Sequence, residues 1–104
     1  MNFNNIINKI KLINPNIKFI GSFDVNNLKT GYWEIYYTNG NLYSKGNYIN
    51  GLRDGYWEEY WIYGNLYSKG NYKNGLKDGY WEDYYCSSGR IWTKGNYING
   101  VFYE

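Results

Sequence analysis

Three glutamates, Glu34, Glu58 and Glu82, recur at a spacing of 24 residues, each within the same Tyr-Trp-Glu motif. Carboxylates act in proteins as general acids, general bases and cation ligands, so these positions are the first candidates for chemistry. The 104 residues include no histidine and a single cysteine, Cys86. This composition leaves no Ser-His or Cys-His nucleophile and no Cys and His cluster that binds a metal. We therefore expect no enzyme, no catalytic residue, no metal and no cofactor.

A lysine lies 11 or 12 residues after each glutamate, and this lysine changes the expected role of the carboxylate. Each lysine would face its glutamate across a hairpin if the chain folds back on itself between them. Such exposed pairs stabilise a sheet by only about 0.2–1 kcal/mol each, so we interpret them as surface ion pairs rather than reactive groups. The expected pairs are Glu34 with Lys45, Glu58 with Lys69, and Glu82 with Lys94.

The glutamates belong to an internal repeat, which is the strongest organising feature of the sequence. Two copies, 31–54 and 55–78, have a period of 24 residues, and a third, 79–104, gains one residue in its first turn. Residues 17–30 resemble a degenerate half-repeat, as expected of a terminal unit in a stack. A fixed period of this length indicates one repeat domain built by stacking similar units.

Each repeat is predicted to form two strands joined by a turn, so the chain becomes an antiparallel meander of roughly seven or eight short strands. Asn39-Gly40 favours a two-residue turn with positive φ at both positions, whereas the third repeat has a three-residue loop, 87–89. Asn-Gly pairs at 50–51, 74–75 and 99–100 predict the hairpins that link one repeat to the next. The further expected cross-strand partners are Trp33 with Gly46, Trp57 with Gly70, Trp81 with Gly95, Tyr36 with Tyr43, Tyr60 with Tyr67, and Tyr84 with Trp92.

Alternation along the strands separates the side chains into two faces. The more apolar face carries four of the five tryptophans, whose rings fit beside small residues such as Ser44 and Gly46, and we call it the tryptophan face. The other combines tyrosines with the Glu and Lys pairs, and we call it the tyrosine face. We expect the tryptophan face to be the better buried. The tyrosine face is predicted to carry Tyr32, Tyr36, Tyr43, Tyr56, Tyr60, Tyr67, Tyr80, Tyr84 and Trp92.

Residues 1–14 are predicted to form a short amphipathic helix that lies on the sheet or on a partner. The apolar residues from Phe3 to Ile13 are spaced by one, three and four, which places them on one helical face. Asn14-Pro15 ends the helix, because a residue before proline avoids the helical region.

The tyrosine face is the stronger candidate for a binding surface. Tyr and Trp are enriched at interaction hot spots because they bring a large contact area at low entropic cost. A role in which the tyrosines only make a thin sheet soluble stays open as the alternative. The predicted partner-binding residues are Tyr36, Tyr43, Tyr60, Tyr67, Tyr84 and Trp92, with Glu34, Glu58 and Glu82.

Charge and composition narrow the classes of partner. The formal net charge at pH 7 is +2, from 11 Lys and Arg against 9 Asp and Glu. Single-stranded nucleic acid needs uncompensated positive charge and is therefore a weaker alternative. The single cysteine and the absence of a signal-peptide pattern predict a cytoplasmic location. Binding of the N-terminal helix, with Lys9 and Lys11, to an anionic membrane surface is a further alternative.

The three copies resemble MORN repeats in their shorter bacterial and phage-like form. The matching segments read GYWEIYY, NGNL and KGNYING in the first copy, and similar segments recur in the other two. The resemblance covers 31–100 and, more weakly, 17–30. It implies a single-layered antiparallel sheet of hairpins and contains no catalytic residue.

The same resemblance implies a function in binding. MORN modules mostly serve as scaffolds, dimerisation elements or protein-binding surfaces, and lipid headgroup binding has been proposed for them. Related bacterial sequences are described as antitoxin-like. We therefore expect a non-enzymatic protein-binding module of an inhibitor or antitoxin type that sterically blocks a partner protein. The alternative is a structural scaffold that forms a homodimer through a sheet edge or through Val101-Phe102-Tyr103.

Overall fold

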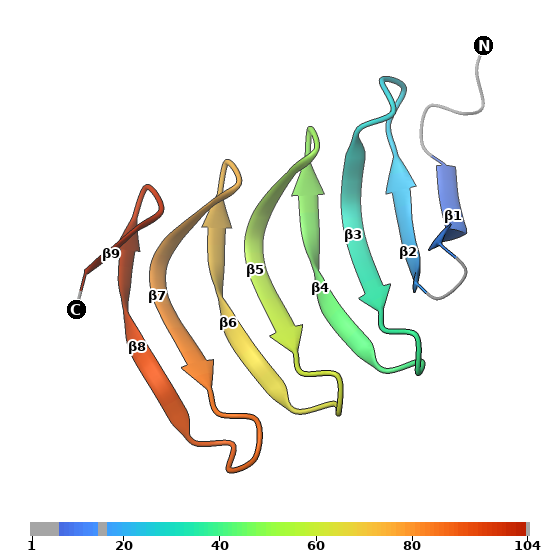
Figure 1. Cartoon of the computed structure of the whole chain (residues 1–104). Helices are drawn as coiled ribbons and strands as arrows, with labels where there is room; N and C mark the ends of the chain where they lie inside the picture. The colour runs from blue at the N-terminus through green and yellow to red at the C-terminus, as the bar shows by residue number, and fades with distance from the viewer. Residues whose placement is uncertain (1–6, 15–16, 104) are drawn as a thin grey trace.

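The described residues form one antiparallel sheet, with no second layer over either face. The computed structural model describes the backbone of residues 7–14 and 17–103, and side chains from residue 18 to residue 103. Nine strands lie in sequence order, each paired with the next (Figure 1). The molecule measures 49 × 32 × 16 Å, so its thin dimension corresponds to a single sheet with its side chains. The predicted all-β antiparallel meander is confirmed.

The strands are of similar length except for the last, which is short. The β2–β3 loop and the turns between repeats lie at one end of the strands (top in Figure 1), and the loops inside the repeats lie at the opposite end. The strands are β1 (Ile7–Asn14), β2 (Ile17–Phe23), β3 (Lys29–Tyr36), β4 (Leu42–Ile49), β5 (Leu52–Tyr60), β6 (Leu66–Lys73), β7 (Leu76–Tyr84), β8 (Ile91–Ile98) and β9 (Val101–Tyr103).

The N-terminal helix predicted for residues 1–14 is not found in the described part of the chain. Residues 7–14 form strand β1, which pairs antiparallel with β2, and residues 1–6 lie outside the described residues. The spacing of the isoleucines fits a helix, but isoleucine is β-branched and favours strands, and asparagine is a weak helix former. The open edge of β2 also offers backbone hydrogen bonds that stabilise a strand there. No helix in the described residues is long and apolar enough to cross a membrane.

The Asn-Gly turns between repeats have the predicted geometry. At Asn50-Gly51 the φ angles are 52° and 79°, and Ile49 pairs directly with Leu52 across the turn. Positive φ at both positions defines the two-residue turn that fits the twist of a hairpin. The turns at 74–75 and 99–100 have the same pair of positive angles.

The turn inside the first repeat differs from the prediction. Residues 38–40 form a three-residue loop, closed by the N–H of Tyr37, which donates to the carbonyl of Asn41 at 2.8 Å. Gly40 has a positive φ of 91°, whereas Asn39 does not share this conformation. The prediction of a two-residue turn is therefore wrong here, and the loop is the next commonest hairpin type, in which one left-handed glycine completes the turn.

The corresponding loop of the third repeat is one residue longer than predicted. It contains four residues, 86–89, and is closed by the N–H of Tyr85, which donates to the carbonyl of Arg90 at 2.9 Å. Gly89 adopts the expected left-handed conformation, with a φ of 71°.

A β-bulge beside these loops alters the end of the predicted register. The expected Trp-Gly and Glu-Lys partners are confirmed in all three repeats. Tyr36, however, pairs with Leu42 and leaves Tyr43 as an extra residue, so the predicted pair of Tyr36 with Tyr43 is wrong. A bulge places two residues of one strand against one of its partner, which re-aims the side chains that follow. The same shift pairs Tyr60 with Leu66 and Tyr84 with Ile91.

A second bulge lies at the glycine before each Tyr-Trp pair. Lys45 faces Glu58 while Asn47 faces Asp54, so β5 contains two more residues than β4 over this interval. Gly55 lies inside β5 at this bend and has a φ of 75°, a conformation that glycine adopts at little cost.

The bulge places a tryptophan ring over a glycine of the preceding strand. Trp57 is fully buried, although the sheet has a single layer. Its indole N–H donates to the carbonyl of Asn47 at 2.9 Å, and a Cβ at Gly46 would lie 2.2 Å from the ring atom Cδ2. Any side chain at position 46 would clash with the ring, so glycine is required there. Trp33 over Gly21 and Trp81 over Gly70 repeat this arrangement.

Tyrosine rings and basic side chains cover the tryptophans in place of a second layer. The Tyr48 ring meets the Trp57 ring edge-on, with 5.1 Å between centroids, and the Arg53 guanidinium lies 4.3 Å from the same ring. A 2.7 Å ion pair with Glu59 holds Arg53 in place. Edge-to-face and cation–π contacts of this kind stabilise by roughly 0.5–2 kcal/mol each. Lys29 and Lys77 are the equivalent cations of the other repeats.

Two equivalent serines on the tryptophan face should respond differently to substitution. Ser44 and Ser68 are both buried, but only Ser68 has a partner among the described residues, the carboxylate of Asp83 at 2.5 Å. Ser44→Ala removes an unpaired buried hydroxyl and should leave the free energy of unfolding unchanged or raise it by about 1 kcal/mol. Ser68→Ala should lower it by about 1–2 kcal/mol. Urea denaturation checks both values, and equal losses would contradict the difference in pairing.

Candidate functional site

A pair of tyrosines holds each glutamate on the tyrosine face, and we call this unit a clamp. In β5 the Tyr56 hydroxyl donates to one carboxylate oxygen of Glu58 at 2.7 Å, and the Tyr60 hydroxyl donates to the other. Residues two and four apart lie on the same face of a strand, so the Tyr-x-Glu-x-Tyr spacing builds the clamp locally. The other two clamps are Tyr32, Glu34 and Tyr36 in β3, and Tyr80, Glu82 and Tyr84 in β7.

The clamps favour the ionised carboxylate and the neutral tyrosines. Hydrogen bonds from Tyr36 and Tyr32 lower the pKa of Glu34 below its usual value. The hydrogen bond to Glu34, together with burial, raises the pKa of Tyr36 to about 12. Burial, together with the same carboxylate, raises the pKa of Tyr32 to about 12. The hydroxyls are thus engaged within the protein, and the ring faces are left for contact with a partner.

Charges of alternating sign cross the tyrosine face from strand to strand. Lys45 lies between Glu34 and Glu58 in the register, and its ammonium is 3.5 Å from the carboxylate of Glu58. Lys69 pairs in the same way with Glu82 of the next repeat, at 3.8 Å. The predicted facing of Glu and Lys is confirmed, but these ion pairs join consecutive repeats rather than the two strands of one repeat. Because the charges alternate, the row is close to neutral.

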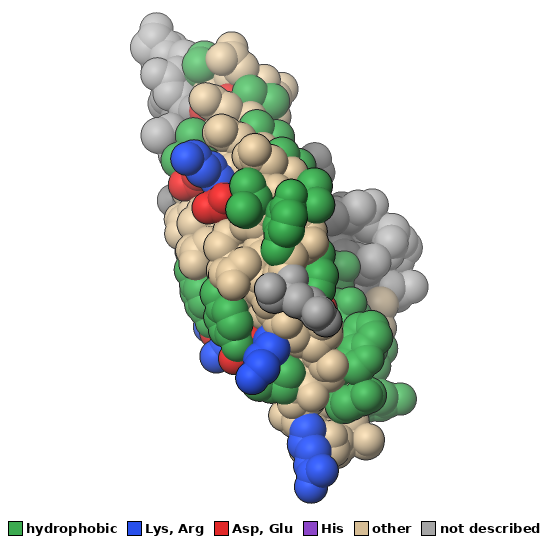
Figure 2. Space-filling view, turned by 90° about the vertical axis from the view of Figure 1, so that its left-hand side faces the viewer, with side chains coloured by type: hydrophobic (Ala, Val, Ile, Leu, Met, Phe, Trp, Pro, Cys, Tyr) green, Lys and Arg blue, Asp and Glu red, His purple; other side chains and the backbone are tan. Residues whose placement is uncertain are grey.

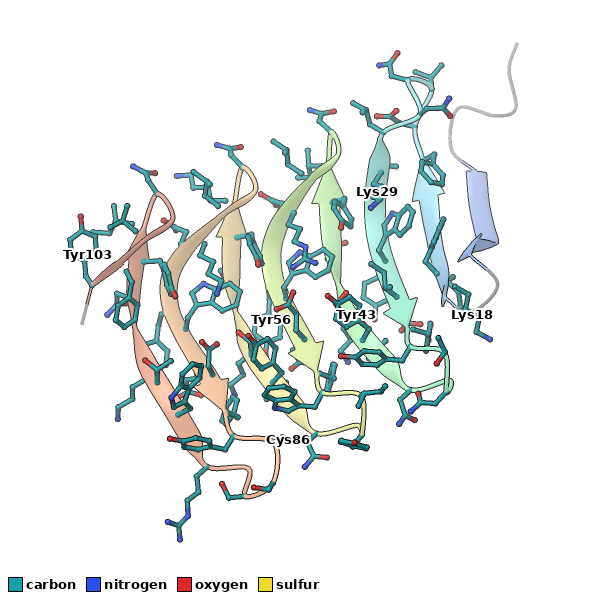
Figure 3. The ribbon with its side chains drawn as sticks, viewed as in Figure 1. Lys18, Lys29, Tyr43, Tyr56, Cys86 and Tyr103 are labelled. Atoms are coloured by element: carbon teal, nitrogen blue, oxygen red, sulfur yellow. The ribbon has the colours of Figure 1, made fainter. Side chains whose placement is uncertain are left out.

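Two equivalent hollows separate the exposed tyrosines of neighbouring repeats. One, of about 310 Å³, lies between Tyr32 and Tyr56, and the other, of about 250 Å³, lies between Tyr56 and Tyr80. Tyr56 forms a wall of both, is 49 % exposed and lies in the middle of the sheet (Figure 3). The remaining lining residues are Lys45, Gly46, Asn47 and Glu58 in the first hollow, and Lys69, Gly70, Asn71 and Glu82 in the second.

The structure divides the predicted partner-binding residues between the two faces. Six lie in the clamps, and three lie on the tryptophan face because the bulge beside each loop inserts a residue and reverses the alternation. The expectation that all nine share the tyrosine face is therefore wrong. The six are Tyr36, Tyr60, Tyr84, Glu34, Glu58 and Glu82, and the three are Tyr43, Tyr67 and Trp92.

The surroundings of Tyr67 show on which side the three displaced residues lie. Its ring packs against the Trp61 ring, with 4.6 Å between centroids. Burial, together with the carboxylates of Asp83 and Glu59, raises its pKa. Both carboxylates belong to the tryptophan face, where they bind a serine and an arginine. Tyr43 makes the equivalent ring contact in its own repeat, at 4.9 Å.

The predicted site left out the most exposed rings of the clamps and the amides beside them. Tyr32, Tyr56 and Tyr80 are 49–51 % exposed, and Asn47 and Asn71 line the hollows between them. The signal that could have identified the tyrosines is the Tyr-x-Glu-x-Tyr spacing, which occurs once in every repeat. The asparagines also recur, in the Lys-Gly-Asn-Tyr segment of every repeat, but this segment does not reveal the hollows that they line, because these depend on the bulge next to them.

The groups on the tyrosine face are suited to recognition. Each clamped carboxylate accepts two tyrosine hydroxyls. In the part of the chain that the structure describes, no three His, Cys, Asp or Glu side chains are grouped so that they could hold a metal ion. The face therefore presents fixed aromatic rings, amide donors and balanced charges.

Alkaline titration should show delayed ionisation of the clamp tyrosines. The folded-state pKa of Tyr32, Tyr36 and Tyr56 is about 12, whereas an unfolded chain has a value of about 10. The clamps thus stabilise the fold fully below about pH 10, and this stabilisation is lost as the pH rises toward 12. Absorbance should show tyrosinate forming at higher pH in the native protein than in denaturant. Coinciding titration curves would contradict the clamp geometry.

Acidification should weaken the fold through the same clamps. The lowered pKa of Glu34, Glu58 and Glu82 contributes stability that is complete above the usual glutamate value and is lost as the pH falls below it. The melting temperature should therefore decline below about pH 4.5. Glu58→Gln should flatten that decline, because one of the titrating groups is gone. A variant that follows the same acid curve as the parent protein is the contrary result.

Comparisons with known proteins assign no family to this chain. A scan against models of protein families finds no match, and a search of curated proteins finds none. The resemblance to MORN repeats therefore stays a prediction from the sequence.

Proposed function

We propose that this chain is a non-enzymatic protein-binding module that uses its tyrosine face. The observation that carries the proposal is the row of half-exposed rings, Tyr32, Tyr56 and Tyr80, each held by a carboxylate. Within the described residues nothing lies over this row. A ring that is already held in place loses little conformational entropy when a partner binds, so its contact area contributes more fully to affinity.

The module is of an inhibitor or antitoxin type, which acts by covering a functional surface of its partner. Two of its dimensions are 49 and 32 Å, so one face offers more than the roughly 800 Å² that each partner buries in a standard interface. A broad single-layered sheet can block a partner's surface sterically. The resemblance to MORN repeats, some of them antitoxin-like, supports the same choice.

A tagged pull-down from the lysate of the source cell, with and without nuclease, tests the proposal. We expect one protein in a stoichiometric ratio to the chain, and we expect it to survive nuclease treatment. The Tyr56→Ala variant should no longer capture this protein. The Tyr63→Ala variant should still capture it, because Tyr63 is a 77 % exposed loop residue outside the clamps. Circular dichroism of both variants controls for folding. Loss of the partner after nuclease treatment, or equal capture by both variants, would overturn the proposal.

Self-association is a second candidate function, favoured by the apolar end of the sheet. Val101, Phe102 and Tyr103 in β9 are 55 %, 40 % and 51 % exposed, and hydrophobic side chains reach the surface at this end (Figure 2). Two copies that meet there would form a homodimeric scaffold. Sedimentation velocity at micromolar concentration separates the two functions. A dimer that Val101→Ser dissociates supports the scaffold, and a monomer supports the binding module.

A further inference from the structure

We infer that the hollows on the tyrosine face bind a proline-rich segment in the polyproline II conformation, which crosses the strands and places one proline in each hollow. The inference rests on the proposed function and specifies the chemistry of the partner. Aromatic grooves recognise such segments because the extended conformation exists before binding and little entropy is lost.

The spacing of the hollows matches the period of a polyproline II helix. Tyr32, Tyr56 and Tyr80 occupy equivalent positions on β3, β5 and β7, so neighbouring rings are two strands apart. At about 4.8 Å between adjacent strands, this interval is about 9.6 Å. A polyproline II helix rises about 3.1 Å per residue with three residues per turn, so every third residue recurs after about 9.3 Å. Prolines three residues apart therefore stay in step with the hollows.

Other regular segments fall out of step with the hollows. On an α-helix, residues seven apart on one face are separated by about 10.5 Å, roughly 0.9 Å more than the interval between rings. On a β-strand, side chains of one face recur after about 6.7 Å, which is far too short. The mismatch accumulates at each hollow, so the row favours a segment with a period of three residues.

The hollows supply hydrogen-bond donors for the carbonyls of a polyproline II backbone. Such a segment has no internal hydrogen bonds, so its carbonyls need external donors. Asn47 and Asn71 are exposed and line the two hollows, and no hydrogen bond joins their side-chain amides to another of the described residues. The tyrosine hydroxyls are already engaged by the glutamates. The rings therefore contribute apolar walls, and the asparagines contribute the polar contacts.

The charges beside the hollows favour an uncharged segment. One Lys-Glu pair borders each hollow, Lys45 with Glu58 in the first and Lys69 with Glu82 in the second. A polyanion would meet no net positive charge in this row, which disfavours nucleic acid. A proline-rich segment carries no charge that needs a counter-ion, so it is compatible with a surface whose charges are already paired.

Peptide binding to the purified chain tests the inference. The probe is a fluorescent peptide of about ten prolines, about 31 Å long when extended, and its control is a Gly-Ser peptide of equal length. A second pair of peptides has prolines at every third or every fourth position. We expect saturable binding of polyproline, none of Gly-Ser, and at least about tenfold tighter binding of the every-third peptide. Failure of polyproline to bind, or equal binding of the spaced pair, would overturn the inference.

Matched variants locate the peptide on the face. Tyr56→Ala should weaken polyproline binding at least about tenfold, because this ring walls both hollows, whereas Tyr56→Phe keeps the ring and should bind within about threefold. Tyr63→Ala should bind like the parent chain. If Tyr56→Ala does not fold, Asn47→Ala combined with Asn71→Ala gives the second test, with a loss of at least about tenfold expected. Unchanged affinity in a folded variant would contradict the inference.

The peptide assay and the pull-down separate the inference from the proposed function. If Tyr56→Ala loses the captured protein but no proline peptide binds, the proposed function stands and the inference is wrong. If the captured protein contains a proline-rich segment and polyproline displaces it, both are supported. If neither capture nor peptide binding depends on Tyr56, both are wrong.

Discussion

Trp57→Ala should lower the free energy of unfolding by about 3–5 kcal/mol, one of the two largest effects we expect from a single substitution. Trp57 is fully buried, lies over Gly46, and donates its indole N–H to the carbonyl of Asn47. Its loss also removes the ring against which the Arg53 guanidinium rests. A domain of this size is stable by only about 5–15 kcal/mol, so the loss is a large share of the total.

Urea denaturation followed by circular dichroism measures this effect. Trp92→Ala is the matched control, because it removes the same side chain from a position that is 57 % exposed. We expect the control to lose at most about 1 kcal/mol. Equal losses in the two variants would mean that the tryptophan face is not the core of the sheet.

Gly46→Ala should destabilise the protein by about 3 kcal/mol, although alanine is usually the better residue. At a position with an ordinary φ, replacing glycine by alanine stabilises by about 0.4–1 kcal/mol, because the unfolded chain loses freedom. At Gly46, however, the added Cβ would lie 2.2–2.5 Å from three atoms of the Trp57 ring. Overpacking against a rigid buried ring costs about 1–3 kcal/mol, and the ring must also leave its hydrogen bond. The clash therefore reverses the usual sign.

A double-mutant cycle with Trp57→Leu isolates the clash. In that background the large ring is absent, so adding Gly46→Ala should change the free energy of unfolding by less than about 1 kcal/mol. Urea denaturation of the four proteins gives the coupling energy directly. Additive losses in the cycle are the contrary outcome, since they would show that Gly46 is needed for backbone reasons rather than for the ring above it.

Most of the sheet could be predicted because the determining signals are local and occur three times. Alternation and the Asn-Gly pairs define the strands, and Asn50-Gly51 adopts the predicted two-residue turn. The position of Trp33 opposite Gly46 was predicted by counting back from the turn, and it is confirmed. The loop is one residue longer than the predicted turn and the bulge at Tyr43 adds one residue to β4, so the two differences compensate before Trp33 and Gly46 are reached.

The bulges are the part of the fold that could not be predicted. The alternation places Tyr43 beside Tyr36, but one extra residue in the strand moves it to the opposite face. Asn39-Gly40 fits two kinds of turn, and the choice depends on how the bulge continues the twist of the hairpin. This choice depends on packing between neighbouring strands, and the spacing of residues along one strand carries no information about that packing.

The arrangement of the tyrosine face could be predicted only in part. The glutamates and the tyrosines that follow them share one face, as predicted. The N-terminal segment was predicted as a helix because its isoleucine spacing fits a helical period, whereas its pairing as a strand depends on the edge of β2. The hollows were not predicted, because they arise from the separation of clamps on different strands.

The most direct test of the tyrosine face as the binding surface is a nuclear magnetic resonance titration with the captured partner. The side-chain amides of Asn47 and Asn71 report on the tyrosine face, and the indole N–H groups of Trp57 and Trp61 report on the tryptophan face. We expect the asparagine signals to shift or broaden while the indole signals stay in place. Shifts of the Trp61 signal with unchanged asparagine signals would show that the partner binds the opposite face.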